Sequence, residues 1–438
     1  MIAAGLGWLA STRALAQGLA ERRSPRSAVP QTSAEGVAAE PRALAPELAR
    51  LPASEEIGAL AVGDGELLAV TRTGVLLRLS GKEWLKLADG FDPLAPLAAG
   101  HGRIAGRSLA GWLRVFEGGK IVRTAGPRLA PHGGFINLPD GIIAVSGPYV
   151  AGGSRPKRGD DGDTAITVRA TRLVRFSFMD GWRESARSDF VVMPDARPLL
   201  VELDCPEAGP GPGGQLVVFA GPSELRYRHG VLGDGVEATQ LIYASCRSLT
   251  PLAMLELADP FVFEDVAPRR FAELETGHEL LATVQSGPQG AALVLVGRPA
   301  PGGAELEIVA QGPPLGTRNR WLSPIVVGHR LYAIHTPHIG GVLTGYRRVG
   351  ARLLPTRLRD GVSNHAIGSR DTNVSTVAGT LLIVPSQKHR ELVALDLEAD
   401  AAARWRLALE ASVVALAAIG EQIFVLDARG RAYAANLR

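Results

Sequence analysis

The chain of 438 residues carries 47 basic and 44 acidic side chains, and its net charge of +3 excludes a global electrostatic field that would draw in nucleic acid. Its 52 glycines, 30 prolines and few aromatic residues favour many tight turns over long helices. The two cysteines form no CxxC motif or cluster with histidine, so no zinc site is predicted.

Residues 1–17 resemble a secretion signal. They are apolar through Leu9 and then reach Ala14-Leu15-Ala16, an A-x-A sequence of the type that signal peptidase cuts. The basic residues expected before the apolar run are missing, so either the true start lies upstream or the segment is a short amphipathic tail. The segment is too short and interrupted to span a bilayer. The signal interpretation predicts a periplasmic or extracellular protein without a transmembrane segment.

Residues 18–45 are predicted to form a disordered linker, because they are rich in Ala, Pro, Ser, Arg and Glu and lack hydrophobic periodicity. From residue 46 to residue 438, short apolar runs alternate with polar or Gly-containing turns and suit β-strands. Residues 249–266 are out of step with this rhythm and are interpreted as an insertion or a linking strand. Copies of a repeated unit are predicted over residues 57–87, 97–122, 135–178 and 199–243, and then from Phe271, Leu322, Val374 and Val413.

The copies predict an all-β fold, a β-propeller of seven or eight four-stranded blades, with eight favoured. The last copy, residues 412–437, supplies three strands before the chain stops. A blade usually has four strands, and an unpaired sheet edge invites aggregation. Residues 44–51, or the strand that follows them, are therefore predicted to pair with the last blade and close the ring between the N-terminal and C-terminal strands.

One copy resembles the repeats of PQQ-type, quinoprotein-like propellers, whose signature is A-x-D-x-x-x-G-x-x-x-W. Ala394 and Asp396 match the start of this signature, Asp400 stands where the glycine should be, and Trp405 arrives one residue late. The resemblance covers one blade, and it implies the shape of a blade rather than quinone chemistry.

A broader resemblance is to exported FG-GAP/VCBS-type repeat propellers. It rests on three segments, which are residues 313–321, 335–341 and 363–370. These segments cover roughly the C-terminal third of the chain, and the rhythm of the repeats extends the resemblance further. The resemblance implies an exported propeller, often with calcium in loops of the D-x-D-G-D-G type.

Calcium in every blade is not expected in this chain. A hard cation needs several converging oxygen ligands, and the equivalent turns at residues 327–330 and 378–380 offer almost none. The Gly-rich insertion of residues 155–163 holds three carboxylates, but adjacent Arg and Lys can satisfy them, so a solvated loop is favoured over a calcium site. No cofactor is predicted.

A group of polar residues is predicted to converge on the mouth of the central channel. Two clusters in neighbouring copies precede strands that should lie innermost, and a pair of histidines lies between them in sequence. Two imidazoles could share a metal, but no third ligand is visible nearby, so an ordered turn is favoured. The alternative for all of these groups is to cap strand ends and bridge blades. The candidate ligand-binding residues are Arg318, Asn319, Arg320, His335, His338, Asn364, His365, Arg370 and Asp371.

The two cysteines leave two alternatives open. Cys205 and Cys246 could form one disulfide if the chain is exported, or they could be separate buried thiols.

No nucleophile elbow, Walker loop, H-E-x-x-H motif or Rossmann fingerprint occurs, and no catalytic residue is predicted. The chain is expected to be a monomeric, non-catalytic binding or interaction module for a protein or a small polar ligand. Two alternatives stay open. One is a propeller enzyme of the lyase, glycosidase or quinoprotein type with its site at the channel mouth, because scattered residues can build such a site. The other is an envelope assembly scaffold that offers an apolar rim or strand edge.

Overall fold

The computed structural model describes residues 44–147, 171–201, 214–274, 277–298 and 305–437. Regular structure in these ranges is nearly all β-strand, and the one helix among them is the short 3-10 turn η1 (Gly230–Leu232). The described part of the chain holds no helix long and apolar enough to cross a membrane. The signal-like segment 1–17, nearly all of the linker 18–45 and the insertion 155–163 lie outside the described residues.

The first three groups of strands are antiparallel sheets whose strands are hydrogen-bonded in chain order. The first contains β2 (Ile57–Gly63), β3 (Glu66–Thr71), β4 (Leu76–Ser80) and β5 (Glu83–Ala88). The second contains β6 (Ala98–Gly100), β7 (Arg103–Arg107), β8 (Leu113–Glu117) and β9 (Lys120–Val122). The third contains β11 (Phe135–Leu138), β12 (Gly141–Val145), β13 (Leu173–Phe178) and β14 (Trp182–Arg187), with β10 (Thr124–Ala125) added parallel to β14.

The middle of the chain forms three further groups that are joined into one 13-stranded sheet. The first contains β15 (Leu199–Val201), β16 (Gln215–Ser223), β17 (Glu237–Ser245) and β18 (Pro251–Glu256). The second contains β20 (Arg269–Ala272), β21 (Glu279–Gly287), β22 (Gly290–Gly297) and β23 (Glu307–Gln311). The third contains β24 (Leu322–Val327), β25 (Arg330–His335), β26 (Val342–Val349) and β27 (Arg352–Asp360).

Two short pairings join these three groups. β19 (Val262–Phe263) lies between β17 and β21, and Gln311 of β23 pairs with Arg352 of β27. The out-of-step segment 249–266 is thereby explained. It contains β18, which completes one group, and β19, which links that group to the next.

The last two groups again have four strands each. One contains β28 (Thr376–Ala378), β29 (Leu381–Pro385), β30 (Glu391–Asp396) and β31 (Ala402–Ala408). The other contains β32 (Val413–Ile419), β33 (Gln422–Asp427), β34 (Ala432–Asn436) and β1 (Ala49–Leu51). β1 runs antiparallel to β34, with Ala49 opposite Ala434, which is the pairing that the missing fourth strand predicted.

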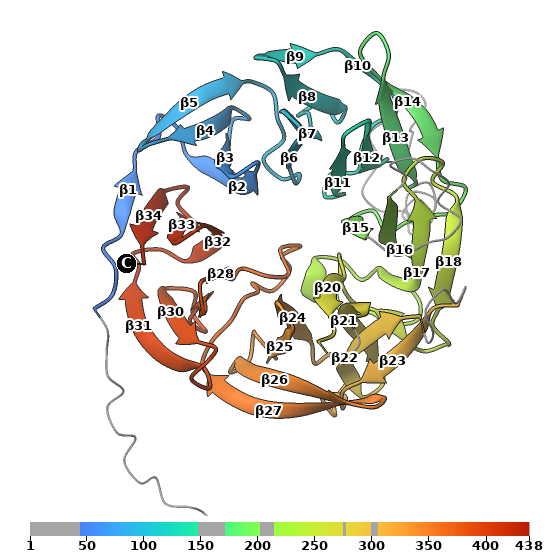
Figure 1. The fold of residues 1–438 in the computed structure, drawn as a ribbon, viewed down its shortest axis with the longest axis vertical. Coiled ribbons are helices and arrows are strands. Elements are labelled where there is room, and N and C mark those ends of the chain that lie inside the picture. Colours follow the sequence, from blue (N-terminus) through green and yellow to red (C-terminus); the bar gives the residue numbers. More distant parts are fainter. Residues whose placement is uncertain (1–43, 148–170, 202–213, 275–276, 299–304, 438) are drawn as a thin grey trace, which may run out of the picture. The chain divides into compact units, whose positions relative to one another are not determined.

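Within the unit of residues 41–438, the groups follow one another as propeller repeats. The first strand of each group lies toward the middle of the unit and the last strand on its outside (Figure 1). The first strands of several consecutive groups are in contact, namely β2 with β6, β6 with β11, β20 with β24, and β28 with β32. β32 also contacts β2, so the last group packs against the first.

Apolar layers between consecutive groups form the core. Leu67 of β3 and Phe424 of β33 belong to one buried cluster, and Ile334 of β25 and Val384 of β29 belong to another. Burying such side chains contributes about 1.5–3 kcal/mol each. The central strands are therefore covered on both faces, which is why a strand such as Leu381–Pro385 is a continuous apolar run rather than an alternating one.

Candidate binding site

Residues 361–375, here called the crossing loop, join β27 to β28 by way of the middle of the unit (Figure 1). There the Gly368 N–H donates a hydrogen bond to the carbonyl oxygen of Val231 in η1, at 2.8 Å. This close contact requires glycine at position 233 for two reasons. Its φ of 103° favours glycine, and a Cβ would lie 2.8 Å from both Arg370 Nη1 and the Gly368 carbonyl oxygen. The loop thus ties the group of β24–β27 to the group of β15–β18.

Arg370 is the main electrostatic anchor of the crossing loop. Its Nε donates to Asp195 Oδ2 at 3.2 Å, and its Nη2 donates to Asp234 Oδ2 at 2.6 Å. Asp195 is buried, and burial, together with the negative charge of Asp234, raises its pKa to about 6 in spite of Arg370. The guanidinium therefore offsets the cost of carboxylates that have been taken out of water.

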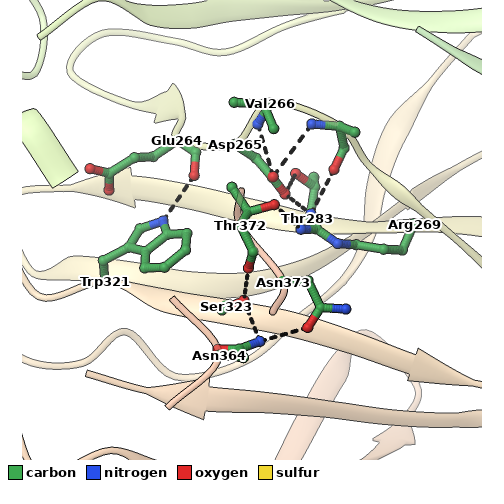
Figure 2. Close-up of polar contacts among 11 residues, drawn as sticks. Glu264, Asp265, Val266, Arg269, Thr283, Trp321, Ser323, Asn364, Thr372 and Asn373 are labelled. Atoms are coloured by element: carbon green, nitrogen blue, oxygen red, sulfur yellow. Dashed lines mark hydrogen bonds and ion pairs between the residues drawn. The ribbon is translucent and has the colours of Figure 1, made fainter. Parts of the chain in front are cut away.

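A second polar network fixes the return of the crossing loop (Figure 2). Arg269 Nη2 donates to Thr372 Oγ1 at 2.7 Å, and Ser323 Oγ donates to the Thr372 carbonyl oxygen at 2.5 Å. Asn364 Nδ2 donates to Ser323 Oγ at 2.8 Å and to Asn373 Oδ1 at 2.9 Å. Because Arg269 belongs to β20 and Ser323 to β24, the loop binds two neighbouring groups at once.

Two histidines and a buried tryptophan pack beside this network. His338 Nε2 lies 2.8 Å from His365 Nδ1, and His365 Nε2 lies 2.8 Å from the Ser369 carbonyl oxygen. A carbonyl oxygen only accepts, so His365 Nε2 carries a proton, and neutral His365 accepts from His338 at Nδ1. The ring of Trp321 is stacked on His338 and lies 4.7 Å from His365 between ring centroids, while its Nε1 donates to the Glu264 carbonyl oxygen.

Burial keeps these imidazoles neutral at physiological pH. It lowers the pKa of His338 to about 4, with His229 and His389 as further causes. Burial also lowers the pKa of His365 to about 4, although its hydrogen bond to Ser369 acts in the opposite direction. The fully buried His365 therefore bridges the turn before β26 and the crossing loop as an uncharged group.

A pocket of about 410 Å³, here called the central pocket, is bounded by the crossing loop and by the inner strands β2 and β32. This volume is within the range of small-molecule sites. Four polar side chains reach it, and they are His132, Arg197, Arg370 and Asp371. Its apolar wall includes Ala59, Leu60, Ala61, Leu97, Val414 and Ala415. The site combines an apolar wall with a small number of convergent polar groups.

Glu237 belongs to a group of carboxylates that includes Asp195 and Asp234, the two partners of Arg370. It is 2% exposed, and within the described residues its Oε1 has no hydrogen-bond partner. Burial, followed by the negative charges of Glu264, Asp195 and Asp234, raises the pKa of Glu237 well above its ordinary value. A neutral carboxylic acid is the form that this position favours.

Glutamine at position 237 is expected to stabilise the chain at alkaline pH. Because the folded-state pKa of Glu237 is raised, wild-type stability is fully present below the unfolded-state pKa and falls as the pH rises toward the folded-state pKa. Glu237→Gln removes this loss, so urea unfolding should show a gain of about 1–3 kcal/mol at about pH 8 and little change at about pH 4.5. Glu83→Gln, at an exposed position on β5, is the control. A destabilised Glu237→Gln at both pH values would contradict the prediction.

The structure places the nine candidate residues in more than one location. Arg370 and Asp371 line the central pocket. His338 contacts His365, which lies on the same crossing loop. Asn364 holds the crossing loop to Ser323. The candidates on the crossing loop thus share one neighbourhood, which includes His338.

The other candidates lie elsewhere. The Arg318 guanidinium lies over the ring of Tyr227 at 5.2 Å, and the Asn319 N–H donates to the Tyr227 hydroxyl at 2.8 Å. Arg320 and His335 line a separate pocket of about 480 Å³. These four residues are not among those that line the central pocket.

Sequence reasoning missed several residues of the central pocket. His132 and Arg197, and the buried Asp195 that pairs with Arg370, come from connections between strands early in the chain. No local motif marks them, because their role depends on where the crossing loop arrives. The only available signal was the density of polar residues in the crossing loop itself.

The described residues contain no group of three His, Cys, Asp or Glu side chains that could hold a metal ion. Cys246 is buried, and burial raises the pKa of its thiol to about 12. Cys205 lies outside the described residues, so the disulfide stays a prediction.

Comparison with solved structures shows the fold. The computationally designed protein Ika8 has a TM-score of 0.55 and 8% identity, over 90% of this chain and 100% of its own. Sqt1 from Saccharomyces cerevisiae has a TM-score of 0.56 and 8% identity, over 91% of this chain and 99% of its own. The WD40 β-propeller domain of Doa1 aligns over 90% of this chain and 98% of its own, with a TM-score of 0.41 and 10% identity.

The arrangement of the four-stranded groups shows a propeller of β-sheet repeats. Likeness at such low identity supports the fold alone, and it agrees with the repeated four-stranded groups of this propeller. No protein family and no curated protein sequence matches the chain. The resemblance to FG-GAP/VCBS-type repeats therefore stays a prediction.

Proposed function

We propose that the chain is an exported, monomeric β-propeller of eight blades that acts as a non-catalytic binding module through its central pocket. Eight groups of four strands in the described residues, and the pairing of β1 with β34, support a closed ring. The signal-like residues 1–17 support a periplasmic or extracellular location. The ligand is a small polar molecule or a short segment of a protein.

The observation that carries this proposal is the construction of the central pocket. Its apolar wall comes from the inner strands β2 and β32 and from residues 93–97 of the connection before β6, while its polar groups come from other, distant connections. Such a combination provides affinity through the wall and orientation through the polar groups.

The charges around the pocket favour binding over catalysis. Arg370 is held by Asp195 and Asp234, and Arg197 is paired with Asp371 at 2.9 Å. A catalytic acid or base needs its proton free to move toward a substrate. Of the charged groups that line the pocket, each has an ion-pair partner of opposite sign.

Filling the pocket is expected to abolish binding without unfolding the chain. Val414 on β32 lines the pocket and is 39% exposed, so Val414→Trp should occupy the space that a ligand needs. Val62 on β2 is 44% exposed and is not among the lining residues, so Val62→Trp is a matched control. Ligands for this test come from thermal-shift screening of sugars, metals and quinones, or from affinity capture. We expect them to bind wild type and Val62→Trp alike. Their affinity for Val414→Trp should be at least tenfold lower, a loss on the order of 1.4 kcal/mol or more.

Unchanged binding to Val414→Trp would overturn the proposed use of the pocket. Turnover of a captured or screened small molecule by the wild-type chain, lost in Val414→Trp, would instead support the propeller enzyme.

A further inference from the structure

We propose that the central pocket binds a small organic carboxylate with an apolar body, and that Arg197 is the residue that recognises the carboxylate. This inference rests on the proposed function and adds the chemical class of the ligand.

Arg197 is rigidly placed but incompletely used. Its backbone N–H donates to the Val266 carbonyl oxygen at 2.8 Å, and a Cβ at Gly134 would lie 2.8 Å from the Arg197 Cα, so the backbone is closely packed. An arginine side chain has five N–H donors. In the described residues, the side chain of Arg197 makes one hydrogen bond, from Nη2 to Asp371 Oδ1 at 2.9 Å.

The partner of Arg197 can be replaced by a ligand. Asp371 lies on the crossing loop with its side chain 61% exposed, against 31% for the side chain of Arg197. An ion pair this exposed holds its members weakly, because water screens the attraction and solvates the released carboxylate. An incoming carboxylate offers the same planar acceptor pair to the guanidinium fork.

Arg370 cannot serve in this way, although it also lines the pocket. Its Nε and Nη2 are engaged by Asp195 and Asp234, and releasing them would leave a buried carboxylate without its cation. His132 contributes a polar but uncharged edge. Burial, followed by the positive charge of Arg370, lowers the pKa of His132 and outweighs the opposing effects of its hydrogen bond to the Leu94 carbonyl oxygen and of Asp92. Arg197 is therefore the one lining cation whose side-chain donors are largely unused in the described residues.

The surroundings favour a monoanion with an apolar body. The side chains of Leu60, Ala61, Leu97 and Val414 offer no hydrogen-bonding group to a sugar and no charge to a polyanion. A phosphate would place a second negative charge near Asp371 and near Asp195 and Asp234, the partners of Arg370, where like charges repel. A carboxylate carries one charge and matches the single available guanidinium.

The test compares two probes that differ only at the charged group, N-acetyl-leucine and N-acetyl-leucinamide. Isothermal titration of the full chain at about pH 7.5 should show that the acid binds at least tenfold more tightly than the amide. Arg197→Gln should remove this preference, and Val414→Trp should abolish binding of both probes. Inorganic phosphate should compete poorly.

A second variant keeps the test informative if Arg197→Gln is unstable. Asp371→Asn removes the competing carboxylate of the protein, so we expect it to bind the acid about three- to tenfold more tightly than wild type does. Weaker binding by Asp371→Asn would overturn the inference. Equal binding of acid and amide, abolished by Val414→Trp, would refute the carboxylate class and leave the binding function standing. Absence of binding by either probe up to roughly 10 mM would also overturn the inference, while the pocket itself is tested by the ligands screened above.

Discussion

Alanine at position 370 is expected to destabilise the chain by about 2–4 kcal/mol at about pH 7.5, because it leaves two carboxylates without their cation. Asp195 has a side chain 7% exposed and Asp234 one 33% exposed, so the first carries most of the cost. Below about pH 6 the cost should shrink, because Asp195, whose pKa is already raised to about 6, takes up a proton in both proteins.

Urea unfolding of four proteins separates this effect from general damage to the crossing loop. Asp371→Asn removes a neighbouring, exposed ion pair and should cost less than about 1 kcal/mol. Asp195→Asn in the Arg370→Ala background should restore part of the lost stability, because it removes the stranded charge. If Arg370→Ala were no less stable than Asp371→Asn, the crossing loop would not depend on its buried charges.

The fold could be predicted from the sequence because its signal is local. A central strand such as Leu381–Pro385 is apolar throughout since other groups cover both of its faces, and glycine-containing turns separate it from its neighbours. The pairing of residues 44–51 with the last group followed from counting, because three strands at the C-terminus left one edge open. The segment 249–266 was harder, since β19 breaks the rhythm of the repeat to link two groups.

The candidate site could be predicted only in part, because its contacts span long distances in sequence. Arg370 and Asp371 stood out by composition, but Arg370 meets Asp195 and Asp234, which lie 175 and 136 residues earlier. Asp371 meets Arg197 across 174 residues. No repeat pattern encodes where a loop between two groups of strands will cross to reach others. Arg318, by contrast, lay in an equivalent place in its own repeat and packs on Tyr227 instead.

Protonation of the paired histidines is expected to make the chain sensitive to acid. The pKa of His365 is about 4 in the folded chain and near its ordinary value when unfolded. Because the folded-state pKa is the lower one, the contribution of His365 is fully present above about pH 6.5 and is lost as the pH falls toward 4, by about 3 kcal/mol. His338 does not reduce this loss of stability. The two rings share one hydrogen bond, and protonating both would place two cations against each other.

The measurement is the slope of unfolding free energy against pH for His365→Gln and wild type. Glutamine can still donate to the Ser369 carbonyl oxygen, so the variant should fold, with a loss of about 1–3 kcal/mol at about pH 7.5 from poorer packing on Trp321. Between about pH 6.5 and pH 4 its slope should be smaller than that of wild type by about one proton, or about 1.4 kcal/mol per pH unit. His101→Gln, on an exposed turn, controls for loss of an imidazole. Asp195 and Glu237 act against this loss of stability, because their raised pKa values, due first to burial, stabilise the folded chain in acid. Wild type and His365→Gln share this effect, so it cancels when their slopes are compared. Parallel slopes for wild type and His365→Gln would contradict the prediction, because they would mean that His365 takes up its proton equally in the folded and the unfolded chain.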